Sequence, residues 1–361
     1  MNTRKAHYFA MFGVLTLVGF NTSLSIARAQ GSLTPPGPPA PTMKSLDQIE
    51  PRTPIVSLPF TITNGGSYYL TTNLTGVSGS NGITIASDEV TLDLNGFGLM
   101  GVSGSLHGIF VATNAFYINL TVRNGTVRGW DGNGVDAFSA ENAILERLAV
   151  SDTGGYGIDA YGSVIRDCVV DSSGGSGIAA YTSEIQHCTV EYSGNTGIEA
   201  YNSQVRDCVA ENNNYDGIDA YDSRADDCVT EKNAYGIYAA PGQISGCLVE
   251  SNYYSGVYVG ASGCQISDNT CLGNNSSGSS TEAGIYLNAS NNRVEANHVV
   301  GSGQAGIQVA SGSPARNLII RNSVSGNGSS NYVTPGQQIV GPLITATGTI
   351  SSSNPWANFS F

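Results

Sequence analysis

A unit of about 20 residues occurs five times between Gly157 and Val257, and this repeat constrains the fold more than any other feature. The copies begin with Gly-Ile at Gly157, Gly177, Gly197, Gly217 and Gly236. Each copy carries a cysteine 11 residues after its glycine: Cys168, Cys188, Cys208, Cys228 and Cys247. A fixed period of this length indicates one supersecondary unit stacked repeatedly on copies of itself.

Within a unit, the residue pattern predicts three short strands. Apolar residues alternate with polar ones at the start, as at Ile158 and Ala160, which is typical of a strand with one buried face. Two further strands are expected around Ile165 and Val170, separated by the Gly, Ser, Asn and Asp residues of tight turns. Three such strands cannot bury a core alone, but coiled into a rung and stacked on neighbours they enclose one. The repeat therefore predicts an all-β parallel β-helix of about ten or more rungs.

In-register stacking converts the cysteine spacing into a column. The same site is Leu148 before the run and Asn269, Asn297 and Asn322 after it. We expect this column to point inward, with thiols packing as small apolar groups and stacked amides bonded to each other. Parallel neighbours orient their Cβ atoms alike, which favours buried thiols over disulfides, although one rung is within bonding range. A linear stack also disfavours tetrahedral zinc.

The repeated Gly-Ile opening and the Cys or Asn ladder between the second and third strands resemble the right-handed parallel β-helix repeat family, part of the pectin-lyase-like superfamily. The phrase Val90-Thr-Leu-Asp-Leu-Asn-Gly96 is similar to the first rungs of secreted members. The resemblance covers Pro54 to Ile339. It implies a right-handed, single-stranded β-helical solenoid. That superfamily includes lyases, hydrolases, epimerases and non-catalytic surface proteins, so the resemblance leaves the function open.

Four segments are expected along the chain. Residues 1–29 read as a signal peptide, because a basic start and a short apolar run precede Ala27-Arg28-Ala29. Residues 30–53 are a Pro-rich linker and N-terminal cap, residues 54–340 the parallel β-helix, and residues 341–361 a C-terminal tail or cap. We therefore expect a secreted protein, extracellular or at the cell surface, with the periplasm as an alternative. No other segment is apolar enough to predict a membrane span.

The charge of the chain excludes some partners. The formal net charge is −13, and cleavage after Ala29 would remove three basic residues and lower it to −16. Nucleic acids and anionic lipids would be repelled, so neither is an expected partner.

The outward residues of the first strand form stripes that predict a binding face. One stripe is acidic and then aromatic: Asp136, Asp159, Ala179, Glu199, Asp219, Tyr238, Tyr258, Tyr286 and Gln308. Its neighbour is aromatic: Phe138, Tyr161, Tyr181, Tyr201 and Tyr221. Sugar rings stack on aromatic side chains, and carboxylates accept hydrogen bonds from hydroxyls, so the face suits an extended extracellular polysaccharide. The alternative is that tyrosines are simply favoured on β surfaces.

Three acids of this face are candidate catalytic residues: Asp159, Glu199 and Asp219. Separations of one and two rungs, about 4.8 and 9.6 Å, overlap the carboxyl spacings of retaining and inverting glycosidases. Any two acids on such a ladder would show this overlap. The acidic stripe has no Lys or Arg, and the motifs of the superfamily's polygalacturonases and alginate epimerases are absent. Whether the protein is an enzyme is left open; if so, we expect a polysaccharide lyase or glycosidase.

Two further clusters have alternative interpretations. His187 lies between Asp167 and Asp207, which predicts a self-neutralising ion-pair network, with an acid catalyst as the alternative. A third stripe is acidic throughout: Asp171, Glu191, Glu211, Glu231 and Glu250. It predicts a solvated face or bound Ca²⁺, the one candidate cofactor, although no Asp-x-Asp-x-Asp-Gly loop is present.

The favoured hypothesis is a secreted β-helix protein that binds extracellular polysaccharide along its first-strand face. A lyase or hydrolase of the pectin-lyase-like type is the alternative, and a structural or adhesive surface protein is the second alternative. The sequence does not indicate an oligomeric state.

Overall fold

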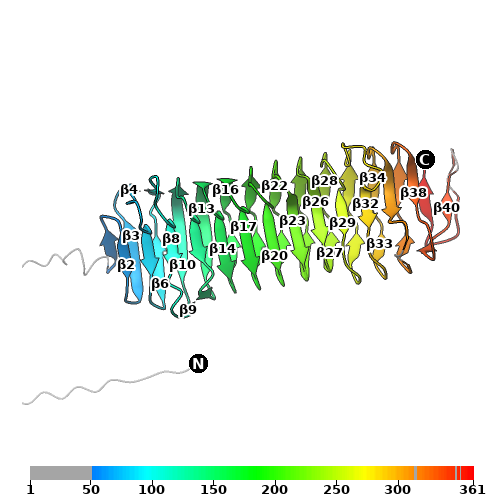
Figure 1. Ribbon diagram of the computed structural model, residues 1–361. Coiled ribbons are helices and arrows are strands. Elements are labelled where there is room, and N and C mark those ends of the chain that lie inside the picture. Colours follow the sequence, from blue (N-terminus) through cyan, green and yellow to red (C-terminus); the bar gives the residue numbers. More distant parts are fainter. Residues whose placement is uncertain (1–50, 313–314, 346–347, 350) are drawn as a thin grey trace, which may run out of the picture. The chain divides into compact units, whose positions relative to one another are not determined.

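The computed structural model describes residues 51–312, 315–345, 348–349 and 351–361. The expected signal peptide and nearly all of the Pro-rich segment lie outside these residues. The described residues form strands and turns and contain no helix, so no helix among them could span a membrane. Figure 1 shows the strands stacked in sequence order within the unit Glu50–Phe361. The predicted parallel β-helix is confirmed.

The first strand of each rung joins a parallel sheet of 13 strands, which we call the first face. Its strands are β2 (Phe60–Ile62), β5 (Ile83–Ile85), β8 (Ile109–Val111), β11 (Val135–Ala137), β14 (Ile158–Tyr161), β17 (Ile178–Tyr181), β20 (Ile198–Tyr201), β23 (Asp216–Tyr221), β26 (Tyr235–Ala239), β29 (Val257–Val259), β32 (Ala283–Leu287), β35 (Ala305–Val309) and β38 (Ser330–Val333).

The second strand of each rung forms the second face. Its strands are β1 (Thr53–Ile55), β3 (Gly66–Leu70), β6 (Val90–Asp93), the starts of β10 (Thr121–Arg128) and β13 (Ile144–Thr153), β15 (Val164–Arg166), β18 (Glu184–Gln186), β21 (Gln204–Arg206), β24 (Ser223–Asp226), β27 (Gly242–Ser245), β30 (Gln265–Ser267), β33 (Arg293–Glu295), β36 (Leu318–Ile320) and β39 (Ile339–Val340).

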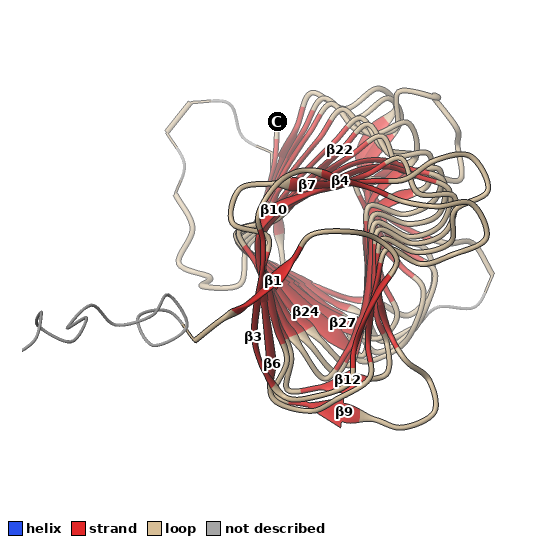
Figure 2. Ribbon diagram, turned by 90° about the vertical axis from the view of Figure 1, so that its left-hand side faces the viewer, coloured by secondary structure: helices blue, strands red, loops and turns tan. Residues whose placement is uncertain are grey.

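The third strand of each rung forms the third face, and Figure 2 shows the three faces around a common interior. Its strands are β4 (Leu74–Thr75), β7 (Gly98–Met100), the ends of β10 and β13, β16 (Val169–Ser173), β19 (Thr189–Glu191), β22 (Val209–Glu211), β25 (Val229–Glu231), β28 (Leu248–Glu250), β31 (Thr270–Leu272), β34 (His298–Val300), β37 (Ser323–Ser325), β40 (Leu343–Ile344) and β41 (Asn358–Ser360). The pair β9 (Tyr117–Ile118) and β12 (Ala140–Glu141) extends one corner.

The glycine that opens each repeat is required by close approach between backbone and core. A Cβ atom at Gly177 would lie 2.1 Å from Val190 Cγ1 and 2.9 Å from the carbonyl oxygen of Gly197. The isoleucine that follows, Ile178, is fully buried in a continuous apolar core. The Gly-Ile signature therefore marks where a rung turns inward onto its neighbours.

The cysteine column points inward as predicted. Its five thiols are at most 1% exposed, and all seven cysteines of the chain are free and buried. The amide of Asn269 continues the column by accepting a bond from Cys247 N (2.9 Å) and donating to Asn297 Oδ1 (3.0 Å). Asn297 and Asn322 repeat this arrangement, and the last amide belongs to Asn358 of β41. The interpretation of buried thiols rather than disulfides is confirmed.

Two further polar ladders line the other turns. At the turn from the first to the second face, Ser183, Ser203 and Ser223 are buried; Ser203 Oγ accepts from Ser183 N and donates to Tyr201 O. At the turn from the third to the first face, Asn213 donates to Asn233, and Asn233 to Asn252. Each ladder satisfies backbone groups that a turn leaves unpaired inside the protein.

Candidate functional site

The acidic row of the first face lies in the predicted register. Asp136 pairs with Asp159, Asp159 with Ala179, Ala179 with Glu199, and Glu199 with Asp219 across successive strands β11 to β23. Ala179 is fully buried although it is an outward residue, because its small side chain is covered by its neighbours. The three candidate catalytic residues are therefore aligned on one face, with Asp159 and Glu199 two rungs apart.

The pKa values of these carboxyls are raised, because the side chains are partly buried and the causes of the shifts include no cation. Burial, with Asp136 and Glu199 nearby, raises the pKa of Asp159 to about 7. Burial and Glu199 raise the pKa of Asp219 to about 6. The Oδ1 atoms of both aspartates are buried without a hydrogen-bond partner among the described residues. Only Glu199 has a short neutral donor, Ser176 Oγ, at 2.6 Å. The row can therefore hold protons near neutral pH.

Sequence reasoning missed a fifth acid beside this row, Asp216. Burial, with Asp219 and Glu199 nearby, raises the pKa of Asp216 to about 7. Asp216 directly precedes the repeat glycine Gly217. The equivalent residues of the two preceding rungs are Ser176 and Thr196, so this position does not form an acidic column in the sequence. The signal available was its spacing of three residues from Asp219 at the start of the same strand.

At the other end of the row, Asp136 faces His107. The two side chains approach to 3.8 Å (Nδ1 to Oδ2), but His107 Nδ1 also accepts a bond from Asn133 N at 3.0 Å. An acceptor nitrogen carries no proton, so this imidazole contacts Asp136 without donating to it.

The tyrosines that follow the acids on the same strands form a stacked column. Tyr161, Tyr181, Tyr201 and Tyr221 pair in register, and the rings of Tyr181 and Tyr201 lie 4.9 Å apart at an angle of 6°. The rings of Tyr201 and Tyr221 lie 5.8 Å apart. Burial, with Asp159 and Glu199 nearby, raises the pKa of Tyr181 to about 12, so its hydroxyl stays protonated and able to donate.

A second group of tyrosines occupies strands β26 to β32. Tyr238 and Tyr258 stack at 5.3 Å and 10°, and Tyr286 lies 5.5 Å from Tyr258. Asn288 Nδ2 donates to the hydroxyl of Tyr258 at 2.8 Å, which orients the ring. All seven predicted tyrosines thus lie on the first face, in two groups.

The structure adds residues to this second group that the sequence did not indicate. Tyr235 lies 5.5 Å from Tyr258 and 5.0 Å from Tyr254. It extends the aromatic surface toward the turn from the third to the first face, which we call the third turn. Glu282 is buried, accepts a bond from Tyr235 at 3.3 Å and is also bonded to Ser255. Its position depends on the inserted segment 274–281, which the repeat pattern could not place.

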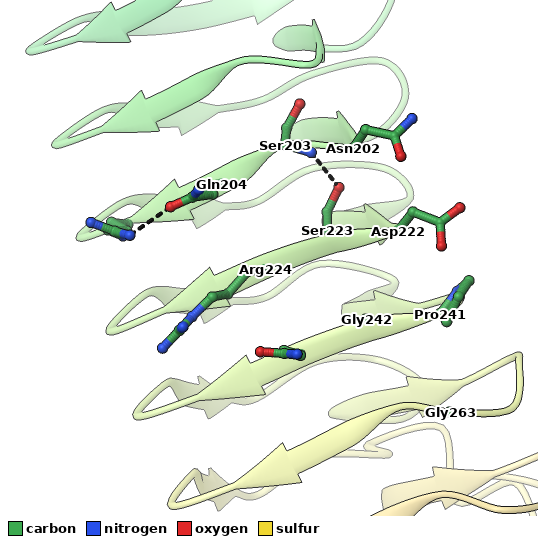
Figure 3. Close-up of a pocket in the computed structure, with 11 residues that line it drawn as sticks. Asn202, Ser203, Gln204, Asp222, Ser223, Arg224, Pro241, Gly242 and Gly263 are labelled. Carbon is green, nitrogen blue, oxygen red and sulfur yellow. Dashed lines mark hydrogen bonds between the residues drawn. The ribbon is translucent and has the colours of Figure 1, made fainter.

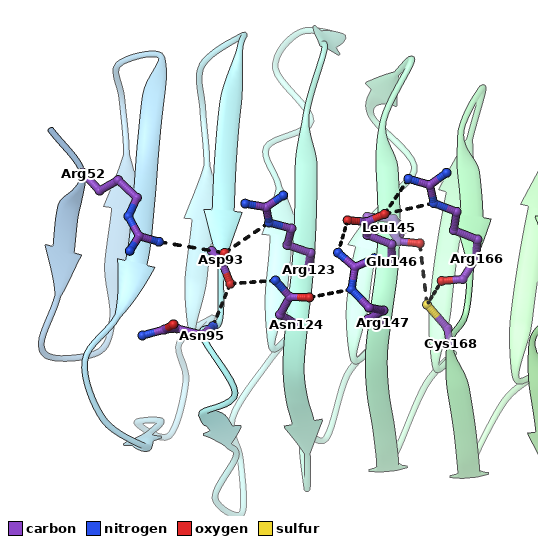
Figure 4. A network of polar contacts seen from close by, with 10 residues as sticks. All are labelled: Arg52, Asp93, Asn95, Arg123, Asn124, Leu145, Glu146, Arg147, Arg166 and Cys168. Carbon is purple, nitrogen blue, oxygen red and sulfur yellow. Dashed lines mark hydrogen bonds and ion pairs between the residues drawn. The ribbon is translucent and has the colours of Figure 1, made fainter. Parts of the chain in front are cut away.

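The charged residues of the second face and around His187 are largely self-neutralised, whereas the acidic stripe of the third face has one ion pair among the described residues, Lys232 with Glu231. His187 lies 3.6 Å from Asp167 and 3.7 Å from Asp207, the predicted ion-pair arrangement. Figure 4 shows the network on the second face, where Arg123 binds Asp93 and Arg166 binds Glu146. The acidic stripe of the third face has the predicted register from Asp171 to Glu250.

No ready metal site is present in the part of the chain that the structure describes. Among these residues, no three His, Cys, Asp or Glu side chains converge as ligands. The two unpartnered oxygens of Asp159 and Asp219 are of the type Ca²⁺ takes, but they belong to strands three rungs apart. The stacked thiols are enclosed in the core and directed at backbone carbonyls.

Two family models match the sequence. Residues 107–243 match the right-handed beta helix region, and residues 184–340 match the periplasmic copper-binding protein (NosD) family. That description names copper, but among the described residues no three His, Cys, Asp or Glu side chains converge as ligands for a metal ion. A comparison with curated proteins found no match.

Solved structures with the same fold are distant in sequence. The A-module of a mannuronan C-5 epimerase from Azotobacter vinelandii is 13% identical, with a TM-score of 0.56 over 80% of this chain and 89% of that one. A mannuronic acid-specific family 6 polysaccharide lyase from human gut microbiota is 11% identical, with a TM-score of 0.52 over 85% and 82%. An E. coli bacteriophage tailspike protein solved with a pentasaccharide is 13% identical, with a TM-score of 0.54 over 82% and 72%.

At 11–13% sequence identity, the similarity to these solved structures shows a shared fold. Together with the family-model matches and the stacked parallel sheets, it agrees with the resemblance noted in the repeat. The chain is a right-handed parallel β-helix repeat protein with the pectin-lyase-like fold.

Proposed function

We propose that this protein is exported and binds extracellular polysaccharide along its first face. The observation that carries the proposal is the pair of stacked tyrosine groups on one sheet, Tyr161 to Tyr221 and Tyr238 to Tyr286, beside a row of hydrogen-bonding carboxyls. Aromatic faces suit the apolar faces of sugar rings, and phenol and carboxyl groups suit their hydroxyls. The fold's solved relatives include an epimerase, a lyase and a tailspike bound to a saccharide, which supports a carbohydrate ligand. A periplasmic or extracellular location fits the family match.

A catalytic role for the acidic row is the second candidate. Asp159, with a pKa raised to about 7, is partly protonated near neutral pH, as a general acid must be. Glu199, two rungs away, would be the matching base, and Asp219 its neighbour. No Lys or Arg stands in the first-face column from Thr61 to Gln308, so the base that a lyase takes from a cationic side chain is missing from it.

The charge of the row predicts which glycans bind. A polyanion must approach Asp159, Glu199 and Asp219 on a chain of formal charge −13, whereas a neutral glycan meets no such repulsion. We expect retention on neutral polysaccharides that persists in a chelator, and retention on polygalacturonate only with Ca²⁺ added. Affinity electrophoresis against a polysaccharide panel measures this. The same mixtures, assayed for new reducing or unsaturated ends, test catalysis. Tight, chelator-insensitive binding of a polyanion would contradict the assignment of this face.

Tyr258 is the sharpest single test of the face, because it contacts Tyr238, Tyr286 and Tyr235 at once. Replacing it with alanine removes one stacking platform, so Tyr258→Ala should weaken neutral-glycan binding about tenfold, equivalent to roughly 1.4 kcal/mol. Tyr258→Phe keeps the ring and should bind nearly as well as wild type. Tyr192→Ala is the matched control, since Tyr192 is 56% exposed on the third turn and away from this face. Equal affinity of wild type and Tyr258→Ala would remove the second tyrosine group from the site.

A further inference from the structure

The corner between the first and second faces carries a groove that the face described above does not include. One part has a volume of about 590 Å³ and is lined by Asn202, Gln204, Asp222, Arg224 and Gln243. A second part, of about 480 Å³, is lined by residues of the preceding rungs from Asn142 to Glu184. Asn202 and Gln204 line both parts, so the two are continuous along the stack.

The floor of the groove is rigid, while its walls offer free hydrogen-bonding groups. The buried serine ladder, with Ser203 N bonded to Ser223 Oγ at 2.9 Å, forms the floor (Figure 3). The side chains of Asn202, Asp222 and Gln243 are exposed and make no hydrogen bond within the described chain. In Figure 3, Asn202 and Asp222 follow one another along one edge, and Gln204 and Arg224 along the other.

The arginine side chains at the groove are already ion-paired, whereas the carboxyl of Asp222 has no ion-pair partner among the described residues. Arg224 is paired with Asp226, and Arg206 lies 3.9 Å from both Asp226 and Glu184. Gln204 Oε1 also accepts a bond from Arg206, which leaves its amide NH₂ group free to donate. An anionic ligand would have to break these pairs, whereas a neutral hydroxyl-bearing ligand would not.

The arrangement repeats with the rungs. Asn202 and Asp222 occupy equivalent positions in successive rungs, and Gln204, Arg224 and Gln243 pair in register on β21, β24 and β27. Polar side chains therefore recur about every 4.8 Å over the three rungs of Gln204, Arg224 and Gln243, whereas the row of Asn202 and Asp222 ends at Pro241. Such a row suits a polymer whose hydroxyl groups also recur. Tyr201 and Tyr221 directly precede the groove residues Asn202 and Asp222, so the tyrosine column borders the groove there.

We infer that this corner groove is a second binding site, separate from the acidic row, for a linear neutral glycan. The class of ligand rests on the function proposed above, whereas the location rests on the groove alone. The groove binds the hydroxyl groups of the chain through Asn202, Gln204 and Gln243. The acidic row and the tyrosines of β26 to β32 lie outside it.

The test uses isothermal titration calorimetry of the full chain with neutral hexasaccharides (cellohexaose, laminarihexaose, maltohexaose and mannohexaose) in the presence of EDTA. Wild type should bind two equivalents of at least one of them. The combined variant Asn202→Ala, Gln204→Ala, Gln243→Ala should lose one equivalent or weaken it by at least about tenfold. Because these side chains are exposed, its melting temperature should match wild type. Asn195→Ala, an exposed amide at the third turn, is the control and should bind as wild type.

The outcomes separate the two sites. If the combined variant binds like wild type while Tyr258→Ala loses one equivalent of bound hexasaccharide, the proposed groove site is wrong and the first-face site is retained. If the combined variant loses binding and Tyr258→Ala does not, the groove stands and the second tyrosine group is removed from the first-face site. Absence of binding by any hexasaccharide overturns both. Tighter binding of hexagalacturonate, lost in the combined variant, overturns the neutral class of ligand.

Discussion

Cys208→Asp should lower the melting temperature by about 10 °C or more, because it places a carboxylate in a buried site with no cation to balance its charge. Cys208 is 1% exposed, and its thiol is directed at the carbonyl oxygens of Arg206 (3.1 Å) and Ile185 (3.8 Å). Cys188 N, at 3.5 Å, and the weakly donating thiols of Cys188 and Cys228 are its neighbouring donors, and none of them carries a positive charge. An uncompensated buried charge costs about 3–5 kcal/mol, and circular dichroism melts measure the loss.

Cys208→Asn is the matched control, since it differs from the aspartate only in replacing an oxygen by an NH₂ group. Asn269, in the same column, accepts from Cys247 N and donates to Ile244 O at 3.0 Å. An asparagine at 208 can repeat both bonds, so its melting temperature should stay within a few degrees of wild type. Similar melting of the two variants, or of Cys208→Asp and wild type, would show that the column is not buried as described.

The acidic row should make the protein less stable as the pH rises from 5 to 8. The folded pKa values of Asp159 and Asp216 are about 7 and that of Asp219 about 6, above the unfolded value near 3.9. The folded state then holds protons that the unfolded state has released. The contribution of these bound protons to the free energy of unfolding is fully present below about pH 4, and it is lost as the pH rises through 6 and 7. With solvent screening taken into account, ionisation of the three carboxyls should lower the free energy of unfolding at pH 8 by on the order of 3–5 kcal/mol relative to pH 4.

Asp216→Asn isolates this effect because Asp216 is the most enclosed of the three. The variant should melt several degrees above wild type at pH 8, with a smaller difference at pH 5, since the amide removes a charge that repels Asp219 and Glu199. Asp152→Asn, at an exposed position, should follow the wild-type pH profile. Thermal melts at half-unit steps of pH measure both. Parallel profiles for Asp216→Asn and wild type would mean that the row ionises without cost.

The repeat alone determined the fold and most of the first face. Once rungs stack in register, a constant offset from the repeat glycine becomes a column in space. Cys168 to Cys247, Asp159 to Asp219 and Tyr161 to Tyr221 could therefore be placed without coordinates. Strand periodicity then divided inward from outward residues, because successive side chains of a strand point to opposite faces. The prediction covered positions within strands, where this alternation is strict.

The turns and the insertion were decided only by the tertiary structure. Asp216 joins the acidic row because β23 begins at that residue, whereas β20 begins only at Ile198. Glu282 reaches Tyr235 because the segment before β32 folds back on Ser255. The corner groove lies over the buried serine ladder, between two rows of exposed side chains. Backbone turns have no fixed alternation, and their course depends on hydrogen bonds between rungs, so residue spacing could not have shown these features.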